Sequence, residues 1–224
     1  MHRDRLTHAI QYEFRDQSLL KTALTHRSFG TPNYERLEFL GDSVLNCIIA
    51  EELYQRFPQL PEGDLSRVRA IIVKQQSLHT HAKRLGIGDC LLLGEGEIKS
   101  GGRARPSILA DALEAIIGAI SLDGGFESAR VVVLRIFETV LSDANPAVLG
   151  KDPKTLLQEL LQGRRMALPQ YSVIAVDGEA HQQRFTVACT VAQLNIRVTG
   201  EGMSRRAAEQ HAAGVIYGQL IAGD

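Results

Sequence analysis

The spacing of apolar residues changes once along the chain, and this change constrains the fold more than any other feature. Up to residue 141, apolar residues recur every three or four positions without strand-like alternation, which predicts helices. From residue 152, a predicted helix is followed by three short alternating runs and a last helix. Between them, Asn-Pro and Gly interrupt a segment without clear periodicity, as is typical of a linker. We therefore predict a multidomain chain of class α and α+β, with an all-helical domain at 1–141, a linker at 142–151 and a small α-β-β-β-α domain at 152–224.

The elements of the second domain follow from local signals. Asp152-Pro153 is a good helix start, with an N-cap and a proline in the first turn, and the predicted helix runs to about Leu161. The alternating runs lie around 171–175, 185–191 and 196–198, and the last helix is expected from Arg205 to about Ile221.

Composition limits the class of protein. A 44% hydrophobic and 23% charged content is typical of soluble globular proteins, and no apolar run is long enough to cross a bilayer. No signal-peptide segment follows the polar N-terminus, so we expect a cytoplasmic protein without a membrane partner. The three cysteines are widely spaced and are predicted to be reduced thiols. The net charge of −1 does not by itself indicate a nucleic-acid partner, so charge placement must decide.

A first group of acids lies on one predicted helix. Glu35, Glu38 and Asp42 have the spacing i, i+3, i+7, which places them on one helix face. The opposite face is predicted to pack on the core through Leu37, Leu40, Val44 and Ile48. Three like charges on one face repel each other, which favours a cation among them. Two of these acids alone could equally form a solvated helix face.

A second group of acids interrupts an apolar helix. Asp111 and Glu114 are the polar residues in Ile108–Ile117, which is apolar nearly all round and is therefore predicted to be buried. Buried carboxylates are costly without a partner, and this helix contains no Lys or Arg. Their partner could be an arginine from elsewhere, such as Arg67 or Arg69. Two acid groups in one helical domain favour a shared site for Mg²⁺ or Mn²⁺, which prefer oxygen ligands. Glu62 is a further candidate.

Other chemistries lack their motifs. The sequence contains no GxSxG, HExxH, P-loop or dinucleotide-binding motif, and no organic cofactor is predicted. A glycosidase could use two carboxylates, but the chain has no Trp to stack on a sugar. The histidines show no ligand spacing, and we expect His79 and His81 to be ordinary surface residues.

The segment Glu35–Leu45, ERLEFLGDSVL, closely resembles the signature motif of the ribonuclease III family. Other matches follow in family order along nearly the whole chain. In the N-terminal part they are His26-Arg27-Ser28, Pro61-Glu62-Gly63, Leu65-Ser66, Lys99-Ser100-Gly101-Gly102 and Ile108-Leu109-Ala110-Asp111. The C-terminal part resembles the family's double-stranded RNA-binding domain at Lys154–Glu159, Gly200–Gly202 and Ser204–Ala213. The length of the signature and the order of the other motifs make the resemblance specific.

The resemblance implies a homodimeric endonuclease that hydrolyses phosphodiester bonds in double-stranded RNA with Mg²⁺, for which Mn²⁺ can substitute. The products would be staggered ends with 5′-phosphate and 3′-hydroxyl groups. Processing of ribosomal RNA precursors, structured messenger RNA and transfer RNA is the expected role. The catalytic metal ligands are expected to be Glu38, Asp42, Asp111 and Glu114, and the supporting acids of the composite dimer site are expected to be Glu35 and Glu62.

The C-terminal domain is expected to recognise the shape of A-form RNA, which presents 2′-hydroxyls and phosphates. Arg205 and Arg206 begin the last helix, where cations and backbone amides both favour phosphate. The expected RNA contacts are Gln158, Glu159, His181, Ser204, Arg205 and Arg206. Two rival functions stay open: a non-catalytic RNA-binding protein, and a metal phosphohydrolase acting on nucleotides.

Overall fold

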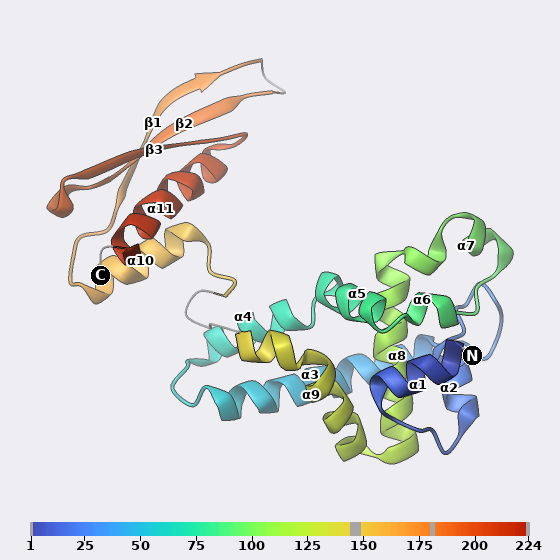
Figure 1. Ribbon diagram of the computed structural model, residues 1–224. Helices are drawn as coiled ribbons and strands as arrows, with labels where there is room; N and C mark the ends of the chain where they lie inside the picture. The colour runs from blue at the N-terminus through green and yellow to red at the C-terminus, as the bar shows by residue number, and fades with distance from the viewer. Residues whose placement is uncertain (1, 144–148, 180–181, 223–224) are drawn as a thin grey trace. The chain divides into compact units, whose positions relative to one another are not determined.

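The protein consists of two compact units, Met1–Pro146 and Ala147–Asp224 (Figure 1). The computed structural model describes residues 2–143, 149–179 and 182–222. The predicted class is confirmed, because helices form the first unit and an α-β-β-β-α order forms the second. The predicted linker overlaps the last helix of the first unit by two residues, and 144–148 lie outside the described residues. Within the described ranges, no helix has the length and apolar character needed to cross a membrane.

In its described part the first unit consists of helices and their connections, with one isolated β-bridge between Thr25 and Leu92. Its elements are α1 (His2–Ile10), α2 (Gln17–Ala23), α3 (Glu35–Arg56), α4 (Glu62–Ile72), α5 (Gln75–Arg84), α6 (Ile87–Cys90), α7 (Glu95–Lys99), the 3₁₀ turn η1 (Gly102–Ala104), α8 (Pro106–Gly124) and α9 (Phe126–Asp143).

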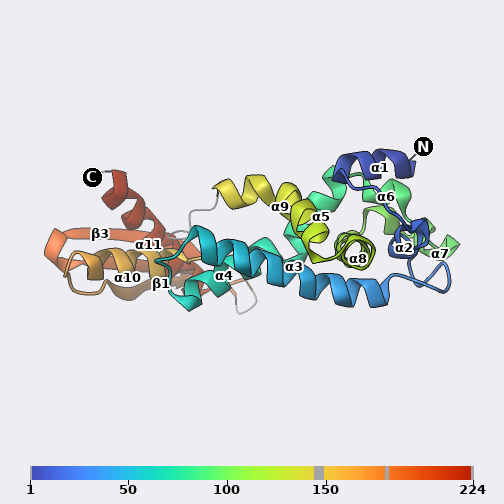
Figure 2. The same cartoon turned by 90° about the horizontal axis from the view of Figure 1, so that it is seen from below.

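Helix α8 lies at the centre of this unit. Figure 2 shows it nearly end-on among its neighbours, and α2, α3, α5 and α9 all pack against it. From Ile108 to Ile120 its side chains are buried, apart from the half-buried Asp111 and Glu114. The prediction of a buried apolar helix is thus confirmed. Burial of so many apolar side chains is the main stabilising contribution that this helix makes to the fold.

The buried face of α3 differs from the prediction. Leu37 and Ile48 are buried as expected, but Leu40 and Val44 are only half-buried. The buried face instead consists of Leu37, Gly41, Leu45, Ile48, Ile49 and Leu53. The prediction was wrong because it placed the core only beneath large apolar side chains, whereas α3 meets α8 at a glycine.

The second unit is a three-stranded antiparallel sheet with two helices packed on it. Its elements are α10 (Pro153–Gly163), β1 (Gln170–Asp177), β2 (Arg184–Val191), the 3₁₀ turn η2 (Ala192–Leu194), β3 (Ile196–Gly202) and α11 (Arg205–Ala222). The Asp152 side chain caps α10 by accepting the Thr155 N–H at 2.9 Å, as the sequence predicted. A Cβ atom at Gly200 would lie 2.3 Å from the backbone nitrogen of Ala212, so glycine lets α11 pack directly on β3.

The expected surface position of His81 is wrong. The side chain is 5% exposed, and its ring lies 4.4 Å from the ring of Phe137 in α9. Burial, helped by the nearby Arg84, lowers the pKa of His81 to about 4. Periodicity within α5 could not reveal this burial, because the covering side chain comes from a helix more than fifty residues later. His79 is half-buried.

Candidate active site and nucleic-acid interface

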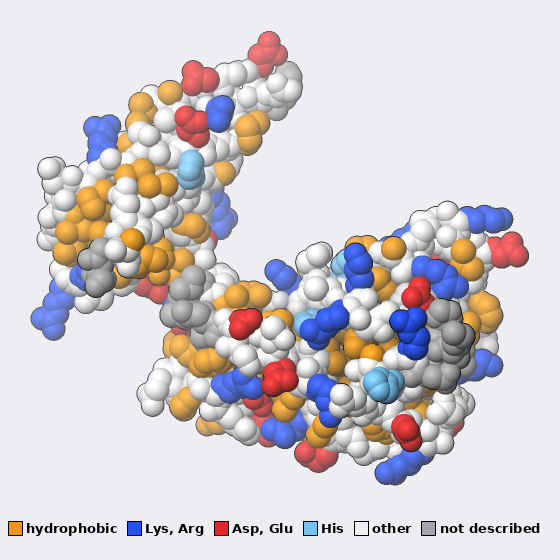
Figure 3. Space-filling model, in the orientation of Figure 1, with side chains coloured by type: hydrophobic (Ala, Val, Ile, Leu, Met, Phe, Trp, Pro, Cys, Tyr) orange, Lys and Arg blue, Asp and Glu red, His pale blue; other side chains and the backbone are white. Residues whose placement is uncertain are grey.

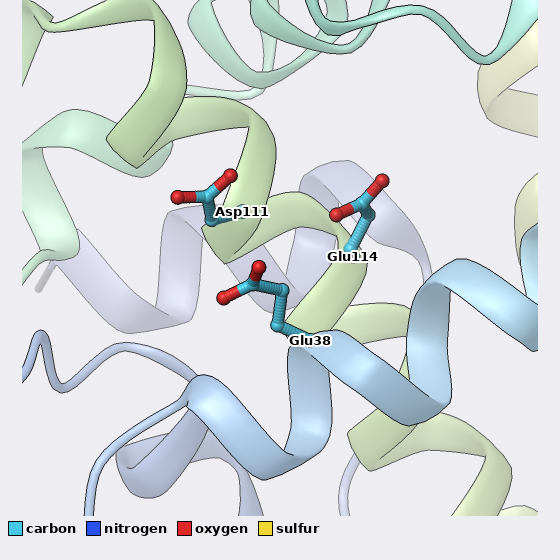
Figure 4. Close-up of side chains that lie close together, drawn as sticks. All are labelled: Glu38, Asp111 and Glu114. Carbon is cyan, nitrogen blue, oxygen red and sulfur yellow. The ribbon is translucent and has the colours of Figure 1, made fainter.

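Three carboxylates from two helices converge at the centre of the first unit. Glu38 of α3 and Asp111 and Glu114 of α8 each offer an oxygen within 4.8 Å of the others (Figure 4). Opposite ligands of one Mg²⁺ ion are about 4 Å apart, since each metal–oxygen distance is about 2.0–2.1 Å. The observed spacing and the all-oxygen donor set therefore fit a hard divalent cation.

The electrostatics of this cluster also favour a cation. Burial and the charges of Asp42, Asp111 and Glu38 together raise the pKa of Glu114 to about 8, and burial is the largest cause. The pKa values of Glu38 and Asp111 are raised as well, with burial as the largest cause in both. The charges that act on Glu114 thus come from carboxylates, which argues against the alternative of an arginine partner.

Asp42 lies one turn after Glu38 on α3. It is exposed, and its Oδ1 atom accepts a hydrogen bond from Asn46 at 2.9 Å. It is outside the compact three-residue cluster, although its charge acts on Glu114. The sequence predicted four metal ligands on two helices. The structure brings three of these carboxylates together and places the fourth at their edge.

Two glycines explain how the two acid-bearing helices come so close. A Cβ atom at Gly41 would lie 1.7 Å from the carbonyl oxygen of Glu114, and one at Gly118 would lie 2.2 Å from the carbonyl oxygen of Leu37. The backbones of α3 and α8 thus touch without side chains between them. Sequence reasoning missed both glycines, although a helical glycine costs up to about 1 kcal/mol relative to alanine and so signals a packing reason.

We expect Gly41→Ala to destabilise the first unit and to reduce activity together. The added methyl group must push α3 from α8, and such overpacking typically costs about 1–3 kcal/mol, while Glu38 moves from Asp111 and Glu114. Urea denaturation and a cleavage assay measure both effects. Gly218→Ala in α11 is the matched control, because a Cβ atom there meets nothing within 4 Å. Unchanged stability in Gly41→Ala would contradict the proposed close crossing.

A cavity of about 510 Å³ opens beside the cluster. Its lining combines acids, cations and hydroxyl groups from His26, Arg27, Ser28, Tyr34, Glu35, Glu38, Glu97, Arg105, Ser107, Ile108 and Asp111. Glu35 is exposed here and lies 3.6 Å from Arg27. One predicted supporting acid therefore shares this cavity with two of the predicted metal ligands.

Glu62 lies elsewhere in the unit. It accepts a hydrogen bond from Ser66 at 2.6 Å and lines a separate cavity of about 190 Å³ with Leu53 and Tyr54 of α3. Leu53 follows Glu38 by fifteen residues along α3, which corresponds to roughly 22 Å of helix. Within one chain, Glu62 is therefore not brought to the carboxylate cluster.

Sequence reasoning also missed Tyr34, which immediately precedes α3. Its side chain is 3% exposed, and it lines the same cavity as Asp111. Burial and the neighbouring charges of Asp111 and Glu38 raise the pKa of Tyr34. The His26-Arg27-Ser28 motif was a usable signal, because His26 packs edge-on against the Tyr34 ring at 5.6 Å.

Charged residues on the surface are mixed in sign. Figure 3 shows Lys and Arg side chains over α5 and α6 with acids among them. Lys83, Arg103 and Asp89, for example, line one shallow pocket there. No single sign dominates this face, so charge alone does not mark an RNA site on it.

Four of the expected RNA contacts lie on the two helices of the second unit, and Ser204 immediately precedes α11. Gln158 is half-buried, and Glu159 is exposed and pairs with Lys151 at 2.6 Å. Ser204 caps α11 by accepting the Ala207 N–H at 3.2 Å. Arg205 and Arg206 are exposed in the first turn of α11, and His181 lies outside the described residues.

Glu209 is a feature that the sequence reasoning did not find. It is 8% exposed and pairs with Lys154 of α10 at 2.6 Å and with Arg205 at 2.9 Å. The hydrogen bond from Lys154 is the largest cause that lowers the pKa of Glu209. The Lys154 ammonium also lies 4.5 Å from the centre of the Tyr171 ring. Glu209 thus joins the two helices and holds one of the predicted RNA-contacting arginines.

Comparison with known proteins identifies a family for each unit. Residues 16–140 match the family described as "Ribonuclease-III-like", and residues 153–220 match the "Double-stranded RNA binding motif". Ribonuclease 3 from Dechloromonas aromatica is 58% identical over 213 residues, which covers 95% of this chain and 96% of the relative. Ribonuclease 3 from Cupriavidus taiwanensis is also 58% identical, over 95% of this chain and 83% of that protein.

A solved structure agrees with the first unit. The nuclease domain of ribonuclease III from Campylobacter jejuni has a TM-score of 0.61 and 46% identity, covering 63% of this chain and 97% of that chain. The family matches of both units, the sequence identity over nearly the full chain and the similarity of the first unit to a solved structure all indicate one family. The chain belongs to the ribonuclease III family of double-stranded RNA endonucleases.

Proposed function

We propose that this chain hydrolyses phosphodiester bonds within double-stranded RNA with the help of a divalent metal. The observation that carries the proposal is the convergence of Glu38, Asp111 and Glu114 in the unit that matches ribonuclease III. The double-stranded RNA binding motif in the second unit supports duplex RNA as the substrate. A non-catalytic RNA-binding protein would not need three crowded carboxylates, whose mutual repulsion costs stability without a cation.

The proposed metal is Mg²⁺, with Mn²⁺ as a substitute. Glu38, Asp111 and Glu114 would hold it, and Asp42 would add a fourth acid at the edge of the cluster. When bound, such an ion activates water and stabilises the charge that develops on the phosphate and the leaving oxygen. The carboxylates orient the site and compensate the charge of the ion. The expected products are staggered ends with 5′-phosphate and 3′-hydroxyl groups.

The second unit, at 152–224, is proposed to be the RNA-binding domain, joined by the 142–151 linker to the catalytic domain at 1–141. Arg205 and Arg206, which are exposed at the start of α11, would contact phosphates, and Ser204 lies at the same end of this helix. Gln158 and Glu159 of α10 would contact 2′-hydroxyls, and His181 would enter a neighbouring minor groove. Glu159 forms an ion pair with Lys151, so its carboxylate must remain accessible beside Lys151 to contact a 2′-hydroxyl.

We also propose a homodimer. Helix α3 exposes two aromatic side chains, Phe39 at 78% and Tyr54 at 73%, which supports a contact with a second copy. The Campylobacter nuclease domain is described as having a region involved in dimer formation. In such a dimer, Glu62 of one copy would lie near the carboxylate cluster of the other copy, although it does not reach the cluster of its own chain. Glu35 lies in the cavity beside the cluster of its own chain.

Processing of ribosomal RNA precursors, structured messenger RNA and transfer RNA is the role that we propose for this endonuclease. A location in the cytoplasm follows from the same proposal, because this is where the transcripts are available.

The test uses matched substrates of one sequence: RNA duplex, single-stranded RNA and DNA duplex, each with Mg²⁺ or with EDTA. We expect internal cleavage of the RNA duplex alone, and only with metal. Binding of the RNA duplex without cleavage would support the non-catalytic alternative. Release of phosphate from free nucleotides, with the duplex left intact, would support the phosphohydrolase alternative.

A further inference from the structure

We propose that Glu209 is a positioning residue for RNA binding, whose carboxylate holds the Arg205 side chain in the orientation that binds a phosphate of the duplex. The inference rests on the proposed function, in which the second unit binds duplex RNA and Arg205 contacts a phosphate. It goes further by giving an acidic residue, which by its charge alone would repel RNA, a part in holding the duplex.

The Glu209 carboxylate has a fixed position in the second unit. Its Oε2 atom accepts a hydrogen bond from the Lys154 ammonium at 2.6 Å. Lys154 is held in turn by α11 and β1, because its backbone N–H donates to Gln210 at 3.0 Å and its ammonium lies 4.5 Å from the centre of the Tyr171 ring. Burial of Glu209 limits its rotamers further, so the carboxylate offers Arg205 an acceptor with little freedom to move.

The contact with Glu209 uses the inner nitrogen of the Arg205 guanidinium. The Nε atom donates to Oε1 of Glu209 at 2.9 Å. Among the described residues, neither terminal nitrogen of this guanidinium has a hydrogen-bond partner, and 64% of the side chain is exposed. A guanidinium can bind a phosphate through two parallel hydrogen bonds, and its two terminal nitrogens suffice for this. The contact therefore orients the arginine without occupying the atoms that would bind RNA.

The charges around Glu209 leave a positive site for a phosphate. Glu209 is 8% exposed and pairs with two cations, Lys154 and Arg205. The bond from Lys154 is the largest cause that lowers the pKa of Glu209, so the carboxylate is ionised at neutral pH. One carboxylate with two cations gives a net charge of +1, and the guanidinium is the more exposed partner. The acid is thus compensated within the protein.

An arginine that is already ordered loses less side-chain entropy when RNA binds. Immobilising one long side chain at an interface weakens binding by about two- to tenfold. Because Glu209 holds Arg205 at Nε in the free protein, part of this cost falls on folding and not on binding. Glu209 should therefore increase the affinity for duplex RNA through Arg205.

Two simpler roles for Glu209 make different predictions. If its charge mattered only through repulsion of phosphate, Glu209→Gln would raise the affinity for duplex RNA. If it only joined α10 to α11, the substitution would lower the melting temperature and leave the affinity of the folded protein unchanged. The positioning role predicts weaker binding despite the loss of a negative charge.

The experiment measures the affinity of the full chain for an RNA duplex in EDTA, together with the melting temperature. We expect Glu209→Gln to weaken binding about two- to tenfold. Glu201→Gln on β3 is the matched control, because Glu201 pairs with Arg184 at 2.8 Å and the substitution removes the same charge. Its affinity should stay the same or rise slightly. Unchanged or tighter binding by Glu209→Gln would overturn the inference.

A double-mutant cycle tests whether Glu209 acts through Arg205. Arg205→Gln should weaken binding in the unsubstituted chain and weaken it less in the Glu209→Gln background, because the arginine is no longer positioned there. Arg206 is exposed in the same turn and, within the described part of the chain, makes no ion pair with Glu209. Arg206→Gln should therefore cost the same affinity in both backgrounds. Equal costs of Arg205→Gln in both backgrounds would contradict the positioning role.

Glu209→Asp is the test if the glutamine variant does not fold. It keeps the negative charge beside Lys154, but its carboxylate is one methylene shorter and cannot hold both cations at their observed distances. We expect weaker duplex binding than in the unsubstituted chain, and unchanged binding would overturn the inference. Failure of the proposed function has a different sign: Arg205→Gln without effect on duplex affinity would remove Arg205 from the RNA contacts, and with it the basis of the inference.

Discussion

Glu114→Gln is expected to reduce cleavage of duplex RNA by more than about a hundredfold, beyond the 10–100-fold effect typical of outer partners. The amide keeps the size of the side chain but removes the negative charge that a hard cation requires. Duplex affinity should remain, because the proposed RNA contacts lie in the second unit. Single-turnover cleavage and a duplex-binding assay in EDTA measure the two effects separately.

The same substitution should stabilise the metal-free protein. Burial and three neighbouring carboxylates make an ionised Glu114 costly, as its raised pKa of about 8 indicates. A neutral amide avoids this cost, so the melting temperature in EDTA at pH 8 should rise. Glu138→Gln in α9 is the matched control, because that side chain is exposed and both properties should stay unchanged. Full activity of Glu114→Gln at ordinary Mg²⁺ concentrations would exclude Glu114 as an essential ligand.

Removal of residues 151–224 is expected to weaken duplex binding by roughly a hundredfold or more at physiological salt, because phosphate contacts supply much of such affinity. The remaining part should fold, since residues 1–146 form a compact unit of their own. It should also keep its metal, because the proposed ligands all precede residue 115. Cleavage should persist weakly at low salt and fall steeply as salt increases. Binding and cleavage at two salt concentrations test this.

Charge reversal tests the contribution of the two arginines to duplex binding separately from that of the rest of the second unit. Reversing Arg205 and Arg206 together should reproduce much of the truncation's defect, but Arg205→Glu also places a second carboxylate beside Glu209. Arg206→Glu alone is therefore the cleaner variant, and it should reduce the salt dependence of binding by about one phosphate contact. Arg197→Glu on β3 is the control with the same charge change. Truncation without loss of duplex affinity at either salt concentration would show that the second unit is not the RNA-binding part.

The sequence by itself determined the architecture of both units. Periodicities of 3.6 and 2 residues are local properties, so the helical part and the α-β-β-β-α part could be predicted without knowing any long-range contact. Asp111 and Glu114 could be singled out for the same kind of reason, since two carboxylates in an otherwise apolar helix need a compensating partner. The segment Glu35–Leu45 supplied the family resemblance, and the comparisons confirmed the family.

Only the tertiary structure decided which of these acids meet. Glu35, Glu38 and Asp42 share a helix face, yet Glu38 alone joins Asp111 and Glu114 in the compact cluster. The choice depends on where α3 crosses α8, and that crossing depends on the absence of side chains at Gly41 and Gly118.

Three features could not be predicted, for a common reason. They are the burial of His81 beneath Phe137, the distance of Glu62 from the cluster and the position of Tyr34 in the cavity beside Asp111. Each depends on a contact between segments far apart in the chain. Local spacing shows which face of a helix a residue occupies, but the neighbour that covers, repels or orients that residue is set by how the helices pack.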